Sequence, residues 1–296
     1  MQSVSIIVPC YNEQDNLPKL IDKIAKFISD NKDYYVIFVN DGSKDNTLEC
    51  LKNSINEKFV IVSHSRNREY GAAIKSGILS AETDFCITID GDGQHDLQDI
   101  PKMLNQLLES KSDMIVGNRN GKGSSSFRNL GKWMIRKFIT TMTDLSIEDV
   151  NSGMKLYRTE VVKSLIKWAP SDMSFSETIV ILHNHFRYKI SELEINIFNR
   201  EAGKSTININ TAIKAVKEIV FLLINFFPFR FFSLIGTIFF IFGLFWSLPF
   251  LINGEGLTIG SGFIFSSCVL IFLLGIILQT LTRMKFEDYL HVNSKV

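Results

Sequence analysis

The chain has 296 residues, of which 46% are hydrophobic, and its 32 basic residues almost balance its 31 acidic ones. This length suits one large domain or two small ones, and the balanced charge argues against a strongly polyanionic partner such as nucleic acid. The four scattered cysteines lack metal-ligand spacing, which indicates thiols in a reducing compartment rather than a disulfide framework. The N-terminus has neither the basic start nor the long apolar core of a signal peptide, so we expect none.

Apolar runs and amphipathic segments alternate along the first part of the chain. Strands are predicted at Val4–Pro9, Tyr35–Val39, Phe59–Val62, Phe85–Asp90 and Asp113–Val116. Helices are predicted at about Leu17–Ser29, from Lys44 onward with Asp45 or Ser43 as the cap, at Gly71–Ala81 and at Asp99–Leu108. The alternation predicts an α/β fold with a mostly parallel, Rossmann-like sheet and helices on both faces.

Polar clusters end three of these strands, and ligands of open α/β sheets bind at that edge. The clusters are Tyr11-Asn12-Glu13, Asp41-Gly42-Ser43 and Asp90-Gly91-Asp92. No glycine-rich GxGxxG turn follows the first strand and no GxxxxGK[ST] sequence occurs, which disfavours a dinucleotide site and a P-loop.

The stretch FCITIDGDGQHD, residues 85–96, is a buried-strand pattern that breaks into closely spaced carboxylates. Oxygen atoms of Asp90, Asp92 and Gln94 form a hard-ligand set that suits Mg²⁺ or Mn²⁺, and such a metal would hold a diphosphate. The alternative is an acidic turn that only caps the next helix.

The C-terminal region contains two uncharged apolar stretches, Phe231–Ile252 and Leu257–Leu281. Each exceeds the roughly 20 residues that a membrane-spanning helix needs. A pair of buried core helices is the alternative, but too little chain remains to cover them. The short gap between them predicts a hairpin, and the basic residues Lys204, Lys214, Lys217, Arg230, Arg283 and Lys285 all flank it. The positive-inside rule therefore places both flanks, and the N-terminal domain, in the cytoplasm.

The expected organisation is a cytoplasmic domain at 1–209, an interfacial helix at 210–229, a transmembrane hairpin at 230–283 and a cytoplasmic tail at 284–296. The interfacial helix is predicted from Ile213, Val216, Val220 and Leu223, which recur at helical spacing. Packing of this helix on the soluble domain remains the alternative.

The sequences SIIVPCYNEQDNL, FVNDGSKDNT and ITIDGDGQHD together resemble the nucleotide-sugar-binding half of GT-A family 2 glycosyltransferases. The resemblance implies that Pro9, Tyr11, Glu13, Asp41 and Asp90 bind the nucleotide. It also implies that Asp92 and Gln94, with Asp90, hold Mg²⁺ or Mn²⁺ on the donor diphosphate. A carboxylate can accept a hydrogen bond from a base imide or a ribose hydroxyl.

The segments MIVGNR, DVNSG and IFNREAGKST narrow the resemblance to polyprenyl-phosphate glycosyltransferases. The resemblance implies that Arg119, Arg128 and Arg200 bind donor or acceptor phosphates, for which the arginine fork is well suited. Asp149 is expected near the sugar and the acceptor. Further acceptor-phosphate candidates are Lys132, Ser152 and Lys204, and Glu177 is expected to support the site. For each basic residue, a solvated surface charge is the alternative.

The histidines before the apolar stretches, His64, His95, His183 and His185, show no spacing typical of a catalytic triad. We expect His95 to line the metal turn and the other three to be structural.

The resemblance implies inverting, metal-dependent transfer of a sugar to undecaprenyl phosphate at the cytoplasmic membrane, with UDP-glucose as the expected donor. GDP-mannose is the second donor candidate, and a non-catalytic membrane protein that binds nucleotide sugars is the alternative outside enzymes. A processive polysaccharide synthase is disfavoured because the chain lacks a QxxRW motif, and a transporter because the spans carry no buried charge. The hairpin is also a candidate surface for homo-oligomer formation.

Overall fold

The computed structural model describes residues 2–30, 33–54, 56–119, 143, 145–198, 217 and 220–293. The chain divides into two compact units, Met1–Ala215 and Val216–Val296.

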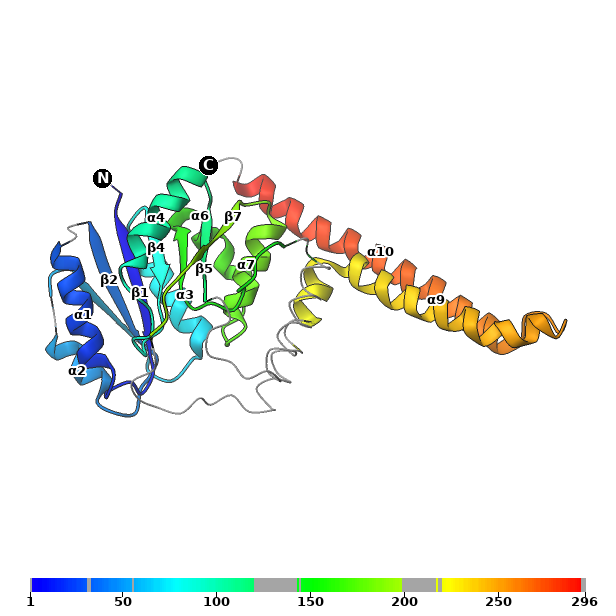
Figure 1. Ribbon diagram of the computed structural model, residues 1–296, viewed down its shortest axis with the longest axis horizontal. Helices are drawn as coiled ribbons and strands as arrows, with labels where there is room; N and C mark the ends of the chain where they lie inside the picture. Colours follow the sequence, from blue (N-terminus) through cyan, green and yellow to red (C-terminus); the bar gives the residue numbers. More distant parts are fainter. Residues whose placement is uncertain are drawn as a thin grey trace. The chain divides into compact units, whose positions relative to one another are not determined.

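Strands and helices alternate through the first unit, as the sequence predicts (Figure 1). In chain order they are β1 (Val4–Cys10), α1 (Leu17–Asp30), β2 (Tyr34–Asn40), α2 (Thr47–Asn53), β3 (Phe59–Ser63), α3 (Tyr70–Ser80), β4 (Phe85–Thr88), α4 (Asp99–Ser110), β5 (Met114–Asn118), β6 (Lys155–Arg158), α6 (Thr159–Leu165), η1 (Ile166–Trp168), α7 (Phe175–His185) and β7 (Ile190–Glu194).

The strands form one seven-stranded sheet of order β3-β2-β1-β4-β6-β5-β7. Only β6 runs against its neighbours β4 and β5, whereas the pairs of β1 with β2 and β4, of β2 with β3 and of β5 with β7 are all parallel. The carboxyl ends of β1, β2, β4 and β5 therefore lie at the same edge. The predicted mostly parallel sheet is confirmed.

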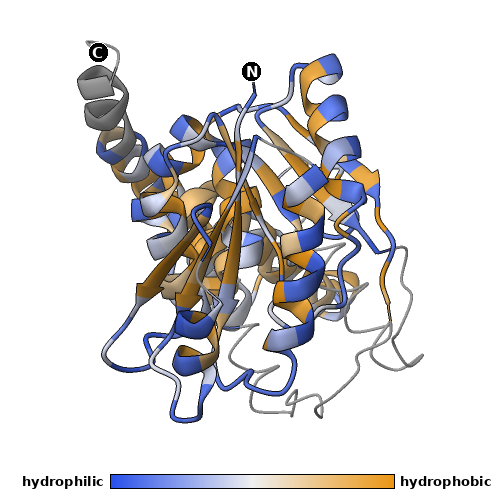
Figure 2. Cartoon of the chain, turned by 90° about the vertical axis from the view of Figure 1, so that its left-hand side faces the viewer, coloured by the Kyte–Doolittle hydropathy of each residue, from blue (hydrophilic) through white to orange (hydrophobic). Residues whose placement is uncertain are grey.

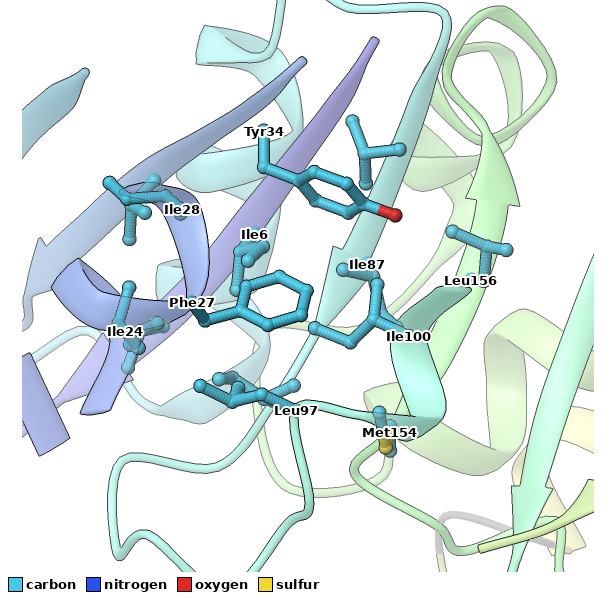
Figure 3. Close-up of a cluster of buried hydrophobic side chains, with 14 of the residues drawn as sticks. Ile6, Ile24, Phe27, Ile28, Tyr34, Ile87, Leu97, Ile100, Met154 and Leu156 are labelled. Atoms are coloured by element: carbon cyan, nitrogen blue, oxygen red, sulfur yellow. The ribbon is translucent and has the colours of Figure 1, made fainter. Parts of the chain in front are cut away.

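One face of the sheet packs against α1 and α4. Helix α1 buries Leu17, Leu20, Ile21, Ile24, Phe27 and Ile28, a spacing of three and four residues that forms one apolar stripe. Phe27 meets Tyr34 of β2 edge to face, with ring centroids 5.1 Å apart. Figure 3 shows this cluster continuing through Ile6 and Ile87 to Ile100 of α4 and Leu156 of β6. Figure 2 shows strands coloured as hydrophobic between helices of mixed hydropathy.

The other face of the sheet contacts α3, which is rich in small residues. A Cβ atom added to Gly77 would lie 2.3 Å from Ile7 Cγ2, so the helix backbone approaches β1 closely. Helix α3 also contacts α6 and α7, which complete this layer. Helices thus cover both faces of the sheet.

Two local predictions differ from the structure. β4 ends at Thr88, so Ile89 and Asp90 belong to the turn that follows it. The first residue before α2 is Asn46, whose side chain makes no capping hydrogen bond. Asp45 instead accepts hydrogen bonds from the backbone N–H and the hydroxyl of Thr47, at 3.1 and 2.6 Å.

The second unit contains α9 (Pro228–Ile252) and α10 (Ile259–Asn293), preceded by a helical segment at 220–226. The segments Pro228–Ile252 and Ile259–Lys285 are long and apolar enough to cross a membrane. The two helices contact each other, and a Cβ atom on Gly236 would lie 2.8 Å from the Phe272 ring. Most of the predicted interfacial helix at 210–229 lies outside the described residues.

Candidate functional site

The predicted nucleotide and metal residues lie on turns at the carboxyl edge of the sheet. Pro9 pairs with Val39 of β2, and the Asp41 backbone N–H donates to Cys10 O at 2.9 Å. The Ile89 N–H donates to Ile7 O at 3.1 Å, which fixes the start of the acidic turn beside β1. Parallel strands thus bring together the turns after β1, β2 and β4, as the sequence predicts.

The turn after β1 is bonded to the turn before α2. The Glu13 N–H donates to Thr47 Oγ1 at 2.9 Å, and Glu13 Oε2 accepts from Asn16 Nδ2 at 2.7 Å. The Asn12 N–H donates to Ser43 Oγ at 3.1 Å. Tyr11 is 41% exposed, so its ring is open to stacking with a base.

The Asp90 carboxylate is held between Tyr70, His95 and Gly153. Tyr70 Oη donates to Oδ1 at 3.3 Å, and burial followed by the charge of Asp90 raises the pKa of Tyr70, which keeps the phenol protonated. The Asp90 N–H donates to His95 Nδ1 at 3.2 Å, so the ring proton lies on Nε2, which faces Asp90 Oδ2 at 3.8 Å. His95 therefore lines the turn, as expected.

The acidic turn after β4 is also hydrogen-bonded to the chain that follows β7. The Gln94 N–H donates to Asp92 Oδ1 at 3.2 Å. Gln94 O accepts the Phe198 N–H at 2.9 Å, and Gln94 Nε2 donates to Phe198 O at 3.3 Å. A small hollow lined by Asp92, Gly93, Lys19 and Lys23 adjoins this turn.

The donor set of this turn fits a divalent cation. No group of three or more His, Cys, Asp or Glu side chains forms a metal cage within the described part of the chain. Magnesium commonly binds through one or two carboxylates together with substrate phosphates and water. The carboxylates of Asp90 and Asp92 and the Gln94 side-chain amide oxygen suit such a shared coordination sphere.

Arg119 and Asp149 form a bidentate ion pair. Arg119 directly follows β5, and Asp149 lies in the segment that precedes β6. Arg119 Nε lies 2.7 Å from Asp149 Oδ2, and Nη2 lies 2.8 Å from Oδ1. Burial opposes ionisation of Asp149, but the hydrogen bonds and charge of Arg119 lower its pKa overall. Asp149 is therefore ionised at neutral pH and is a weak base.

Glu192 of β7 is a site residue that sequence reasoning missed. Its carboxylate accepts the Glu148 N–H at 2.9 Å and the Asp149 N–H at 2.7 Å, which fixes the backbone that carries Asp149. The strand pattern around Glu192 gave no signal for this role, because the bonding depends on a contact between residues more than 40 positions apart.

Lys155 and Glu177 are buried together beneath the segment that carries Asp149. Lys155 Nζ donates to Ser152 O. Burial lowers the pKa of Lys155 and raises that of Glu177, while the opposite charge of each partner counteracts these shifts. Glu177 lies on α7, and its Oε2 has no hydrogen-bond partner within the described residues.

Ser152 is completely buried, and its hydroxyl bonds the Met154 backbone. This position gives an acceptor phosphate no access to the hydroxyl, so we leave Ser152 out of the acceptor site. The predicted phosphate-binding residues Arg128, Lys132, Arg200 and Lys204 lie outside the described residues.

His64 makes two side-chain contacts that the sequence does not predict. It follows β3 and lies between Asp41 and Ser76, within hydrogen-bond distance of both. The sequence gives no triad spacing for this group because the three residues come from different elements.

A substitution at Gly153 tests whether the position of the Asp90 carboxylate matters for activity. A Cβ atom at this position would lie 2.3 Å from Asp90 Oδ2, so we expect Gly153→Ala to displace that carboxylate while leaving the fold intact. The sugar transfer expected from the sequence should fall about 10-fold, because a small misplacement of a site group lowers the rate steeply. Steady-state kinetics and thermal unfolding in detergent measure both effects. Gly262→Ala is the matched control, because a Cβ there meets open space. Unchanged transfer by Gly153→Ala would contradict a role for Asp90.

Comparison with known proteins gives a consistent family assignment. The family model described as Glycosyl transferase family 2 matches residues 5–166. An undecaprenyl-phosphate 4-deoxy-4-formamido-L-arabinose transferase of Proteus mirabilis is 29% identical over 242 residues, which cover 80% of this chain and 72% of the relative. The transferase of the same description from Yersinia enterocolitica is 30% identical over 244 residues, with the same coverage.

The solved structures of Mycobacterium tuberculosis glucosyl-3-phosphoglycerate synthase share the fold. The complex with Mg²⁺ and uridine diphosphate superposes with a TM-score of 0.61 at 16% identity, over 76% of this chain and 79% of that one. The complex with Mn²⁺, UDP-glucose and phosphoglyceric acid gives a TM-score of 0.58 at 17% identity, over 75% and 79% of the two chains.

Proposed function

The chain belongs to glycosyltransferase family 2, and from this premise we propose that it transfers a sugar from a nucleotide diphosphate sugar to a polyprenyl phosphate. The family and the GT-A architecture predicted from the three motifs are confirmed, and the protein is a glycosyltransferase. The observation that carries the proposed acceptor is the similarity over 80% of the chain to transferases named for undecaprenyl phosphate. The two apolar helices of the second unit suit an acceptor that resides in a membrane.

The proposed donor site is the edge formed by the turns after β1, β2 and β4. Pro9, Tyr11, Glu13 and Asp41 would bind the nucleoside, and Asp92 and Gln94, with Asp90, would hold Mg²⁺ or Mn²⁺. The cation would neutralise charge that develops on the leaving diphosphate. Arg119, oriented by Asp149, would bind a phosphate through its remaining N–H groups. Arg128, Lys132, Arg200 and Lys204 stay candidates for the acceptor phosphate.

In the proposed reaction, an oxygen of the acceptor phosphate attacks the anomeric carbon and the nucleoside diphosphate leaves, with inversion at that carbon. The second pKa of a phosphate monoester is about 6, so the nucleophile is already largely ionised at neutral pH. A strong general base is therefore unnecessary, which agrees with the lowered pKa of Asp149. Positioning and charge neutralisation would supply most of the rate.

Two arguments point to different sugars. The sequence determines neither the sugar nor the base, and UDP-glucose is the first expectation, with GDP-mannose second. The relatives are named for a 4-deoxy-4-formamido-L-arabinose, which makes a modified pentose the competitor of glucose. We propose a uridine-linked sugar at the cytoplasmic face of the cell membrane, and the donor panel below decides between the two sugars.

The deciding experiment incubates the full chain in detergent with undecaprenyl phosphate, Mg²⁺ or Mn²⁺, and one labelled donor at a time. The donors are UDP-glucose, UDP-4-deoxy-4-formamido-L-arabinose and GDP-mannose, each with and without chelator. We expect a lipid-linked product from one UDP-sugar and its loss on chelation. The absence of lipid-linked product from every donor would overturn the proposed function, and full activity in chelator would overturn the metal role.

A further inference from the structure

Asp41, His64 and Ser76 form a hydrogen-bonded chain that joins three elements of the first unit. Asp41 follows β2, His64 follows β3 and Ser76 lies in α3. His64 Nδ1 lies 2.6 Å from Asp41 Oδ1, and His64 Nε2 lies 2.8 Å from Ser76 Oγ. The side chains of His64 and Asp41 are 6% and 4% exposed, so water competes little for these contacts.

The hydrogen bonds orient the Asp41 carboxylate. Because an ionised carboxylate only accepts hydrogen bonds, His64 Nδ1 carries the proton and donates it to Oδ1. The same Oδ1 accepts the Arg68 backbone N–H at 2.9 Å. Within the described residues, Oδ2 has no hydrogen-bond partner. The carboxylate is thereby fixed with one acceptor oxygen left for a ligand.

The order Ser–His–Asp also occurs in hydrolases, where histidine activates the serine. Ser76 lies inside α3 (Tyr70–Ser80), where backbone N–H groups are used by the hydrogen bonds of the helix itself. A serine nucleophile needs nearby donors for the oxyanion of its intermediate, and the interior of a helix supplies none. The hydrogen-bonded chain of Ser76, His64 and Asp41 therefore orients the Asp41 carboxylate rather than activating the Ser76 hydroxyl.

We propose that His64 is a positioning residue that presents Asp41 Oδ2 to an N–H group of the donor nucleobase, with Ser76 holding the imidazole in place. This inference rests on the proposed function, because it takes Asp41 as a nucleobase ligand. Because Asp41 Oδ2 can only accept a hydrogen bond, it pairs with an imide N–H, such as that of uracil or guanine. The unprotonated ring nitrogens of cytosine and adenine would face it as a second acceptor.

The test measures binding of UDP, with Mg²⁺, to the full chain in detergent by calorimetry, together with the KM for donor and kcat. His64→Leu should weaken UDP binding about 10-fold or more, because it removes a hydrogen bond to a charged group. The KM for donor should rise equally, while kcat stays within about 3-fold, since the affected contact is made equally in ground and transition states. His64→Asn restores an N–H near the position of Nδ1 and should recover most of the affinity.

Ser76→Ala is the matched second variant, because alanine is the most favourable helix residue and the variant should fold. We expect it to weaken UDP binding by a smaller factor than His64→Leu does. If His64→Leu does not fold, unchanged UDP affinity in Ser76→Ala would overturn the proposal. Equal losses in His64→Leu and His64→Asn, or a fall in kcat without a change in UDP affinity, would also overturn it.

Asp41→Asn separates this inference from its premise. If Asp41→Asn binds UDP as tightly as the wild type, Asp41 is not a nucleobase ligand, and the role of His64 falls with it. If Asp41→Asn loses binding but His64→Leu does not, only the role of His64 is wrong. Because UDP binding is measured without an acceptor, neither result depends on whether the chain forms a lipid-linked product.

Discussion

Replacement of Asp92 by alanine should lower the rate of sugar transfer about 10²- to 10³-fold, the range found when one preorganised electrostatic contact of a transition state is removed. Asp92 is the central carboxylate of the acidic turn, and its Oδ1 accepts the Gln94 N–H at 3.2 Å. If Asp92 holds the cation as proposed, the variant lacks a carboxylate ligand for a cation on the donor diphosphate. Transfer kinetics across a Mg²⁺ titration measure the loss, and excess cation should restore only part of the rate.

Asp149→Asn is the informative comparison for Asp92→Ala. The amide keeps one acceptor for Arg119 but loses the charge of the bidentate pair, whose contacts are 2.7 and 2.8 Å. We expect a rate loss of only about 10-fold, because a loosened phosphate-binding group costs less than a lost metal ligand. Asp22→Ala, an exposed substitution on α1, controls for the loss of any carboxylate. Equal or reversed losses for Asp92→Ala and Asp149→Asn would contradict the mechanism.

Lys155→Met should destabilise the first unit by about 3 kcal/mol or more, because it removes the opposite charge that offsets the burial of the Glu177 carboxyl group. Lys155 is 1% exposed and Glu177 is 7% exposed. For a unit of this size the loss corresponds to a fall in melting temperature of roughly 6–12 °C. Thermal unfolding in detergent, followed by the fluorescence of the first-unit tryptophans, measures the change.

The double variant Lys155→Met/Glu177→Gln tests whether charge compensation is the cause. It removes both charges while keeping the shape of the glutamate side chain, so we expect it to regain part of the lost melting temperature. If the double variant is as unstable as the sum of the two single variants, the two side chains do not interact. An unchanged melting temperature in Lys155→Met would contradict the idea that Lys155 offsets the buried charge of Glu177.

The architecture could be predicted well because its signals are local. The apolar stripe of α1 and the alternation of strands with helices follow from side-chain periodicity, and both occur in the structure. The carboxyl-edge position of Asp41, Asp90 and Asp92 follows from parallel strand order alone. The reversed direction of β6 was not predicted, because strand direction depends on pairing between distant segments, such as Ile87 with Leu156.

The individual contacts of the site could not be predicted for the same reason. Glu192 and His64 make hydrogen bonds with distant segments, and Lys155 interacts electrostatically with Glu177 of α7. The sequence surroundings of all three resemble ordinary strands and loops. Burial also decides which hydroxyl groups a ligand can reach, and the hydroxyl of Ser152 is buried. The sequence motif around Ser152 carries no information on this burial. Residue types at strand ends thus indicate where chemistry is located, whereas the packing decides which side chains take part.

The reversal of β6 has a consequence for how this fold diversifies. Since β5 and β6 are antiparallel neighbours, the chain leaves the sheet after Asn118 and re-enters at Lys155 on the same edge. The segment between them begins and ends beside the proposed donor site. Arg119 and Asp149 join its two ends through their ion pair. Its length can therefore change without shifting any strand, because loop closure costs grow slowly with length. We expect evolutionary insertions that alter acceptor choice to accumulate in this segment.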